Sequence, residues 1–242
     1  YQTSPSAIGK ASQLLVDTLK ALDDPRLPKY ANPNEIDSSY AGAPNLLTVE
    51  ESQAMGVSMP GTSYHGDFIF AKPDWEKPLL SYAEVCFLKA EAAVRGWGTS
   101  AADAQTFYEE GIRASMKFYE VPDDEIDPYL EGNAAYNHNA EDLLEQIITQ
   151  KWLALYFDGF ELFAEYRRTG YPELRKYEME LDNIDIVSID MIPLSETALQ
   201  YPQRLPYPEK EADFNKANYN EAISRQGPDG LYTKIWWSKN TN

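Results

Sequence analysis

Several ingredients of familiar catalytic and membrane-spanning proteins are scarce or missing in this sequence. One cysteine excludes an internal disulfide, and two histidines are few for a metal site built from His and Cys. No HExxH, GxSxG, Walker or GxGxxG pattern occurs. No apolar run reaches the roughly 18 residues that a membrane-spanning helix needs. We therefore predict no catalytic residue, no metal, no cofactor and no membrane insertion by this chain.

Positive charge is also scarce, because the chain has 21 Lys and Arg but 39 Asp and Glu, which gives a net charge of −18. Nucleic acids and anionic membrane surfaces attract proteins that neutralise phosphates with Lys and Arg, so both classes of partner are excluded. Cys86 lies in an apolar helical run and is expected to be a buried, inert thiol. His65 and His138 are expected to be loop residues that make hydrogen bonds. Any targeting segment is expected to have been removed or to lie upstream of Tyr1.

Apolar residues recur at three- and four-residue steps in several parts of the chain, which predicts helices. The predicted helices cover residues 11–22, 82–95, 102–118 and 141–157, with a further helix from Phe160 to the glycine at position 170. In the third of these, the spacing of Ala104, Tyr108 and Gly111 approximates the second half of a tetratricopeptide repeat. We predict a mainly α fold of tetratricopeptide-like helical pairs, at about 79–120 and 140–172, with long irregular loops and little β.

Two stretches lack such a period and are predicted to be loop-rich, residues 26–78 and 173–242. Within the second, residues 184–193 alternate like a strand, and short helices are expected around Ala212 and Ala222. The apolar ending at 231–237 is expected to dock on the body of the protein. The whole of residues 1–242 is treated as a portion of a single domain.

Aromatic residues are the most suggestive feature, because 17 Tyr, 9 Phe and 5 Trp exceed what a small core needs. Rigid rings with a polar edge make good contact surfaces at low entropic cost, and flat sugar faces stack on them. Helical spacing assigns Trp152, Phe160 and Phe163 to the core. Other aromatics fall in predicted loops and are our candidates for ligand contact, with packing beneath a loop as the competing interpretation: Tyr64, Trp75, Trp97 and Tyr136.

Carboxylates offer weaker candidates. A glycosidase needs only two acids across a sugar, but so many acids place some pair at a plausible distance by chance. Glu161 and Glu165 are best explained by ion pairing with the arginines that follow them. Asp123, Glu125 and Asp127 alternate as calcium ligands do, but the glycine and glutamate of an EF-hand loop are missing. We expect a solvated acidic loop there, and an irregular calcium site stays open as the alternative.

Several short motifs, spread over nearly the whole chain, resemble the C-terminal part of SusD/RagB-like proteins. The motifs in chain order are DPRLP at 24–28, the Tyr-x-Gly-x-Pro-Asn segment at 40–45, residues 82–92, ITQKW at 148–152, residues 159–172, RLPYP at 204–208 and residues 229–237. Members of this family are nutrient-binding lipoproteins of the outer membrane of Bacteroidota. The order of the motifs makes the resemblance more specific than any one of them.

The resemblance implies a mostly helical protein whose loop-rich region holds a glycan, an oligosaccharide or another nutrient without cleaving it. It also implies a place at the cell surface, as a lid over a TonB-dependent transporter of the SusC type. The family's acylated cysteine and N-terminal helices have no counterpart in this chain, which we expect to be the C-terminal portion of a longer protein. The alternatives are a helical-repeat scaffold that binds proteins and a glycoside hydrolase.

Overall fold

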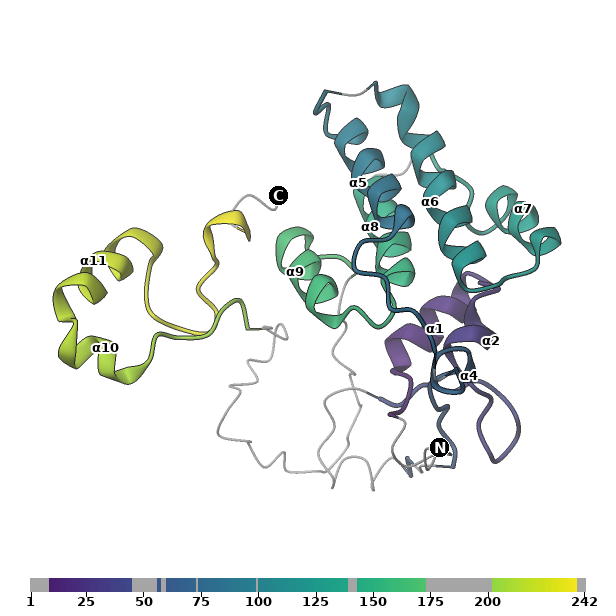
Figure 1. Cartoon of the computed structure of the whole chain (residues 1–242), viewed down its shortest axis with the longest axis horizontal. Helices are drawn as coiled ribbons and strands as arrows, with labels where there is room; N and C mark the ends of the chain where they lie inside the picture. Colours follow the sequence, from purple (N-terminus) through teal and green to yellow (C-terminus); the bar gives the residue numbers. More distant parts are fainter. Residues whose placement is uncertain are drawn as a thin grey trace, which may run out of the picture. The chain divides into compact units, whose positions relative to one another are not determined.

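The computed structural model describes residues 9–44, 56–57, 60–72, 74–98, 100–138, 143–172 and 202–238. Every named element in these ranges is a helix, and strand-like pairing there is limited to isolated bridges (Figure 1). The prediction of a mainly α fold with little β is confirmed. The strand predicted at 184–193 lies outside the described residues.

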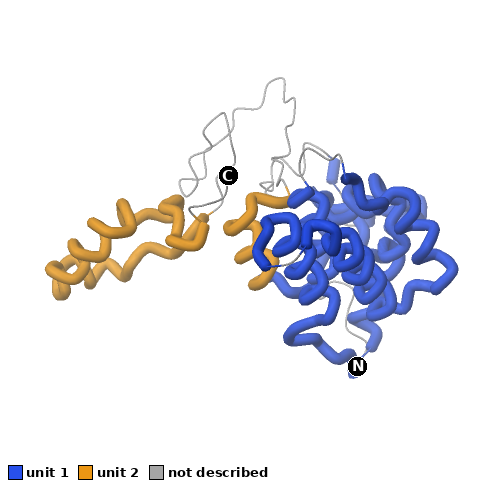
Figure 2. Tube along the Cα trace, turned by 90° about the horizontal axis from the view of Figure 1, so that it is seen from above, with its two compact units in different colours: residues 1–159 blue, residues 160–242 orange. Residues whose placement is uncertain are grey.

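The chain divides into two compact units, Tyr1–Gly159 and Phe160–Asn242, which Figure 2 distinguishes by colour. The assignment of residues 1–242 to one domain stays a prediction.

The centre of the first unit is a pair of helices, α5 (Tyr82–Val94) and α6 (Ala104–Phe118), with α8 (Leu143–Ala154) packed beside them (Figure 1). Gly111 lets α5 and α6 approach closely, because a Cβ atom at this position would lie 2.8 Å from Cζ of Phe87. A short 3₁₀ turn, η2 (Ala101–Asp103), leads into α6. The helices predicted at 82–95 and 102–118 are confirmed.

The acidic loop predicted after α6 is wrong, because residues Asp123–Glu131 form helix α7. Its buried side chains recur at three- and one-residue steps, on one face of the helix: Ile126, Tyr129 and Leu130. They join the core that α5, α6 and α8 build. The acidic residues occupy the first turn, where negative charge favours the helix dipole. A loop was predicted from the acidic residues of this segment, whereas the spacing of its apolar residues indicates a helix.

The long irregular region is organised by a few short helices and backbone hydrogen bonds. Helix α1 (Gln13–Ala21) is capped by the Ser12 hydroxyl, and α2 (Leu27–Tyr30) and α4 (Asp67–Phe70) follow. Isolated bridges join Lys10 to Tyr64, Ser12 to Ala43 and Ala31 to His65. The described part of the predicted loop region is therefore held in place by backbone pairing.

Helix α8 ends at Ala154, three residues earlier than predicted, and α9 (Gly159–Thr169) begins after a turn. Phe157 has a φ of 71°, a left-handed conformation that an α-helix cannot contain. Two of the three aromatic side chains predicted to be core residues also differ from expectation. Phe160 is 93% exposed and Phe163 is 39% exposed, so their assignment to the core is wrong, whereas Trp152 packs against a buried cluster.

The second unit contains α9, α10 (Glu209–Phe214), α11 (Lys216–Gln226) and the short η3 (Trp236–Ser238). The short helices predicted around Ala212 and Ala222 are confirmed.

Glu165 forms an ion pair with Arg168 at 2.8 Å, which confirms ion pairing for one of the two glutamates for which it was predicted. The Arg167 guanidinium lies 5.0 Å from the ring centre of Trp237, so the apolar ending does pack against α9.

A buried polar network joins the segment after α1 to the central helices. The Arg26 guanidinium donates to Asp24 at 2.6 Å, to the Ser115 hydroxyl at 3.0 Å and to the Gln150 amide oxygen at 2.7 Å. The Tyr129 hydroxyl donates to the same carboxylate at 2.7 Å. Burial alone would raise the pKa of Asp24, but the Arg26 charge and these hydrogen bonds hold it below its usual value. One ion pair thus connects α6, α7 and α8.

Replacing Arg26 with methionine leaves the Asp24 carboxylate buried without its cation. We expect the free energy of unfolding to fall by about 3–5 kcal/mol, the usual effect of breaking a buried pair. Urea titration followed by circular dichroism measures this difference. The matched control is Arg113→Met, which removes an exposed pair with Asp127 and should cost at most about 1 kcal/mol. Equal losses in the two variants would contradict a special role for Arg26.

Candidate functional site

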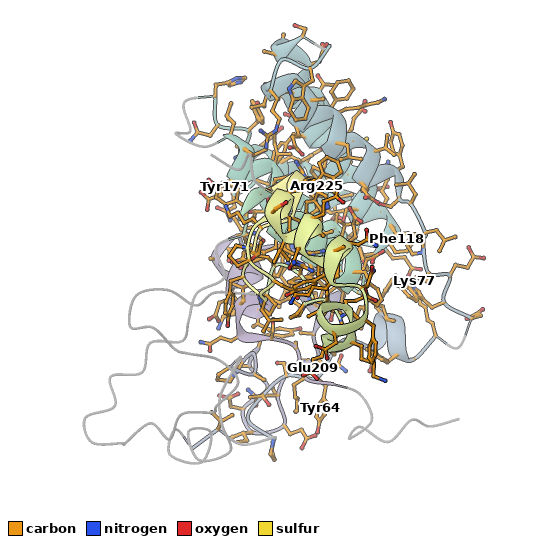
Figure 3. All side chains as sticks on the ribbon, turned by 90° about the vertical axis from the view of Figure 1, so that its left-hand side faces the viewer. Tyr64, Lys77, Phe118, Tyr171, Glu209 and Arg225 are labelled. Carbon is orange, nitrogen blue, oxygen red and sulfur yellow. The ribbon has the colours of Figure 1, made fainter. Side chains whose placement is uncertain are left out.

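The first unit contains a cavity of about 180 Å³ at the C-terminal ends of α6 and α8, beside the segment that leads into α5. Lys77 and Phe118, two of its lining residues, lie on the same side of the ribbon in Figure 3. Five more aromatic side chains contribute to the lining, among smaller apolar and polar residues: Trp75, Tyr82, Tyr119, Tyr156 and Phe157. The cavity combines the end of the irregular region, at Trp75, Lys77 and Pro78, with the ends of the helical scaffold.

Trp75 takes its place through contacts with neighbours on both sides. Its backbone N–H donates to the carbonyl of Lys72 at 3.2 Å, and its ring meets Phe118 edge-on at a centroid distance of 6.4 Å. Phe118 in turn meets Tyr119 edge-on at 5.0 Å. The half-buried indole is thus one side of a continuous wall of rings.

The wall continues inward through Tyr30 of α2. Tyr30 meets Tyr119 edge-on at 4.6 Å and stacks on Tyr156 at 4.1 Å, with 20° between the ring planes. The Tyr119 hydroxyl lies 3.3 Å from the carbonyl of Tyr156, and the Tyr156 hydroxyl donates to the carbonyl of Tyr30 at 2.7 Å. These phenols use their polar atoms within the protein, so what they offer a ligand is mainly ring surface.

The same burial keeps the phenols neutral. It raises the pKa of Tyr119 to about 12 and the pKa of Tyr156 well above its usual range. Neither ring can act as an anionic base at neutral pH. The inner wall of the cavity is therefore uncharged.

His65 supports this wall from behind. Its Nδ1 atom lies 2.5 Å from the Tyr156 hydroxyl, whose proton is directed at the Tyr30 carbonyl. Nδ1 must then be the donor to Tyr156, and burial lowers the pKa of His65, which favours the neutral ring. His65 is a loop residue with a hydrogen-bonding role, as the sequence predicted.

Charged groups are confined to a few positions on the cavity lining. Lys77 is exposed, and Glu84 and Asp158 contribute carboxylates. Among the described residues, no group of three or more His, Cys, Asp or Glu side chains is arranged to hold a metal ion. In the same part of the chain, no helix combines the length and apolarity needed to cross a membrane.

The predicted ligand contacts lie in different places. Trp75 lines the cavity, and Tyr64 lies beneath the Lys10 ammonium, whose nitrogen is 3.1 Å from the ring centre. Tyr136 packs against the core ring of Tyr108 at 5.5 Å. Trp97 follows the far end of α5 and is 64% exposed. Trp75 and Trp97 are therefore separated by the length of α5, about 20 Å, and a ligand role for all four stays a prediction.

Most of the cavity's rings are not among the residues predicted from the sequence, including Phe118, Tyr119 and Phe157. Phe118 ends α6 and Tyr119 follows it directly, whereas Phe157 lies in the turn between α8 and α9. Tyr156 lies within the helix predicted at 141–157, and in the structure it lines the cavity just beyond α8. The available signal was a concentration of aromatics at helix ends, but only packing shows that these ends meet.

Comparison with known families gives a match over residues 4–193 to SusD-like_2, the family described as starch-binding associating with outer membrane. Among solved structures, a chitin-binding protein is 31% identical with a TM-score of 0.72, covering 95% of this chain and 50% of its own. A SusD homologue from Bacteroides fragilis NCTC 9343 is 26% identical with a TM-score of 0.69. The match covers 95% of this chain and 52% of the homologue. A chitin-binding SusD homologue from Flavobacterium johnsoniae is also 26% identical, with a TM-score of 0.68. The match covers 96% of this chain and 50% of that homologue.

This chain spans about half the length of the structures it matches. No curated protein matches it. The family match covers well over half of the chain, and the helical arrangement agrees with solved members along nearly all of it. The chain belongs to the SusD-like family.

Proposed function

We propose that this chain is part of a surface protein of the outer membrane that holds an oligosaccharide without cleaving it. Its partner is a SusC-like TonB-dependent transporter, which takes up the captured ligand. Support for a glycan as the ligand comes from the family description and from the chitin-binding relatives. The observation that carries the proposal is the aromatic cavity beside Trp75.

The lining of the cavity suits a neutral sugar ring. A sugar presents C–H faces that stack on rings, and the inner hydroxyls of Tyr119 and Tyr156 are already used within the protein. A cavity volume of about 180 Å³ suits one sugar ring and not a long chain. The rest of a polymer then lies along the surface, where Lys77 and Asp158 can bind its hydroxyl groups.

The net charge narrows the ligand class further. At −18, the protein repels acidic polysaccharides, and the exposed Lys77 is a single opposing charge on the cavity lining. Neutral glycans such as starch or chitin meet no such barrier. We therefore assign neutral polysaccharides as the ligand class.

Replacing Trp75 with alanine removes the stacking surface that the irregular region contributes to the cavity. We expect retardation in native gels that contain soluble starch or glycol chitin to weaken at least about tenfold in apparent Kd, the effect of a contact worth about 1.4 kcal/mol. Trp75→Phe should retain part of the affinity. The matched control is Trp236→Ala, which removes an 82% exposed tryptophan from the other unit and should leave retardation unchanged. Full retardation of Trp75→Ala would refute binding at this cavity.

A glycoside hydrolase is the second candidate, because Glu84 and Asp158 both line the cavity. We expect no reducing sugar to be released when the protein is incubated with the polymer that retards it. The positive control is the same assay with a hydrolase of that polymer. Release that disappears in Glu84→Gln or Asp158→Asn would overturn the non-catalytic proposal.

A protein-binding scaffold is favoured by a different observation, the exposed leucines that precede α5. Leu79 is 95% exposed and Leu80 is 65% exposed, and adjacent exposed apolar side chains commonly mark protein contacts. Contact with the transporter is compatible with glycan binding. If no polymer retards the protein while the transporter binds it tightly, the scaffold is the better account.

A further inference from the structure

The turn that follows α5 holds its residues in a defined geometry. The backbone N–H of Trp97 donates to the carbonyl of Ala92 at 2.8 Å, and that of Gly96 donates to Ala93 at 3.2 Å. Gly96 has a φ of 72°, in the left-handed region. These features define a Schellman motif, which closes the helix and fixes the backbone of Trp97.

The side chain of Trp97 departs from the usual form of this motif. An apolar residue at its position commonly packs back on the last helical turn, yet the Trp97 side chain is 64% exposed. Instead, the Arg95 guanidinium lies over the indole, 5.1 Å from the ring centre. Arg95 is itself held by a 2.7 Å hydrogen bond to Glu91, which is only 3% exposed. The indole is thus contacted by an anchored cation, while most of the Trp97 side chain stays open to solvent.

The surroundings of Trp97 favour a small ring over a protein as the ligand. The described residues that follow Trp97 in the chain include Gly98, Ala101 and Ala102, which are small and exposed. At Gly98 even an added Cβ would meet no atom within 4 Å. A protein hot spot needs a surrounding ring of contacts that excludes water, which these residues do not supply. A sugar ring needs only a rigid, open aromatic face.

We propose that Trp97, supported by Arg95 and Glu91, is a second carbohydrate contact that stacks on one ring of a neutral polysaccharide. This inference rests on the proposed glycan-binding function and adds a subsite to it. The contact lies beyond the end of α5 opposite the Trp75 cavity, about 20 Å away along the helix. A polymer that reaches both contacts gains avidity that neither contact supplies alone.

The test is native affinity electrophoresis of the whole chain in gels containing glycol chitin or soluble starch. Trp97→Ala should weaken the apparent Kd for the retarding polymer at least about fivefold. Trp97→Phe should lose less, because it keeps a ring on the same backbone. Trp236→Ala, the matched exposed tryptophan, should migrate like wild type. Thermal unfolding checks that the variants stay folded, which the exposure of Trp97 predicts.

The outcomes separate this inference from the proposed function. If Trp75→Ala loses retardation and Trp97→Ala keeps it fully, the second contact is refuted and glycan binding at the cavity stands. If no polymer retards wild type, both proposals fail. A loss in Trp97→Ala equal to that in Trp236→Ala would also refute the subsite, because it would reflect exposed aromatic surface in general.

Discussion

The ion pair between Asp24 and Arg26 is the constraint on which the first unit depends. Both side chains are buried, and burying charge is costly unless each donor and acceptor is paired. Here the guanidinium also reaches Ser115 of α6 and Gln150 of α8. The carboxylate accepts a further bond from Tyr129 of α7. A short irregular segment therefore fixes the relative positions of the helices that surround it.

The same constraint reaches the candidate binding site through α2. Arg26 directly precedes this helix, and Tyr30 lies within it. Because Tyr30 stacks on Tyr156 and meets Tyr119 edge-on, the position of α2 determines the inner wall of the cavity. The helical scaffold and the candidate site therefore depend on the same contacts. The network that holds the helices together also places the rings that a ligand would meet.

The sequence predicted those features that depend on local spacing. The helical period gave α5 and α6 within a residue or two, and the DPRLP motif at 24–28 pointed to a family segment that proves to contain the central ion pair. The errors come from tertiary context. Phe160 and Phe163 follow a core-like period on α9 but remain exposed, and α7 looked like a solvated loop because its charges outnumber its apolar residues.

The cavity itself could be predicted only in part. Trp75 was singled out because it lies in a loop, and the structure gives it aromatic neighbours. Phe118 and Tyr156 come from the ends of two different helices, and no local pattern shows that these ends meet. Trp97 also lies in a predicted loop, but the contact of its ring with Arg95 is visible only in the structure.

The most direct test of glycan capture uses the indole N–H signals of the five tryptophans in a two-dimensional NMR spectrum. A neutral oligosaccharide of several units is titrated into the labelled chain, and single substitutions assign each signal. The account predicts that the signals of Trp75 and Trp97 shift with ligand, while those of Trp152, Trp236 and Trp237 stay in place. Saturable binding that leaves the Trp75 signal unmoved would contradict the account.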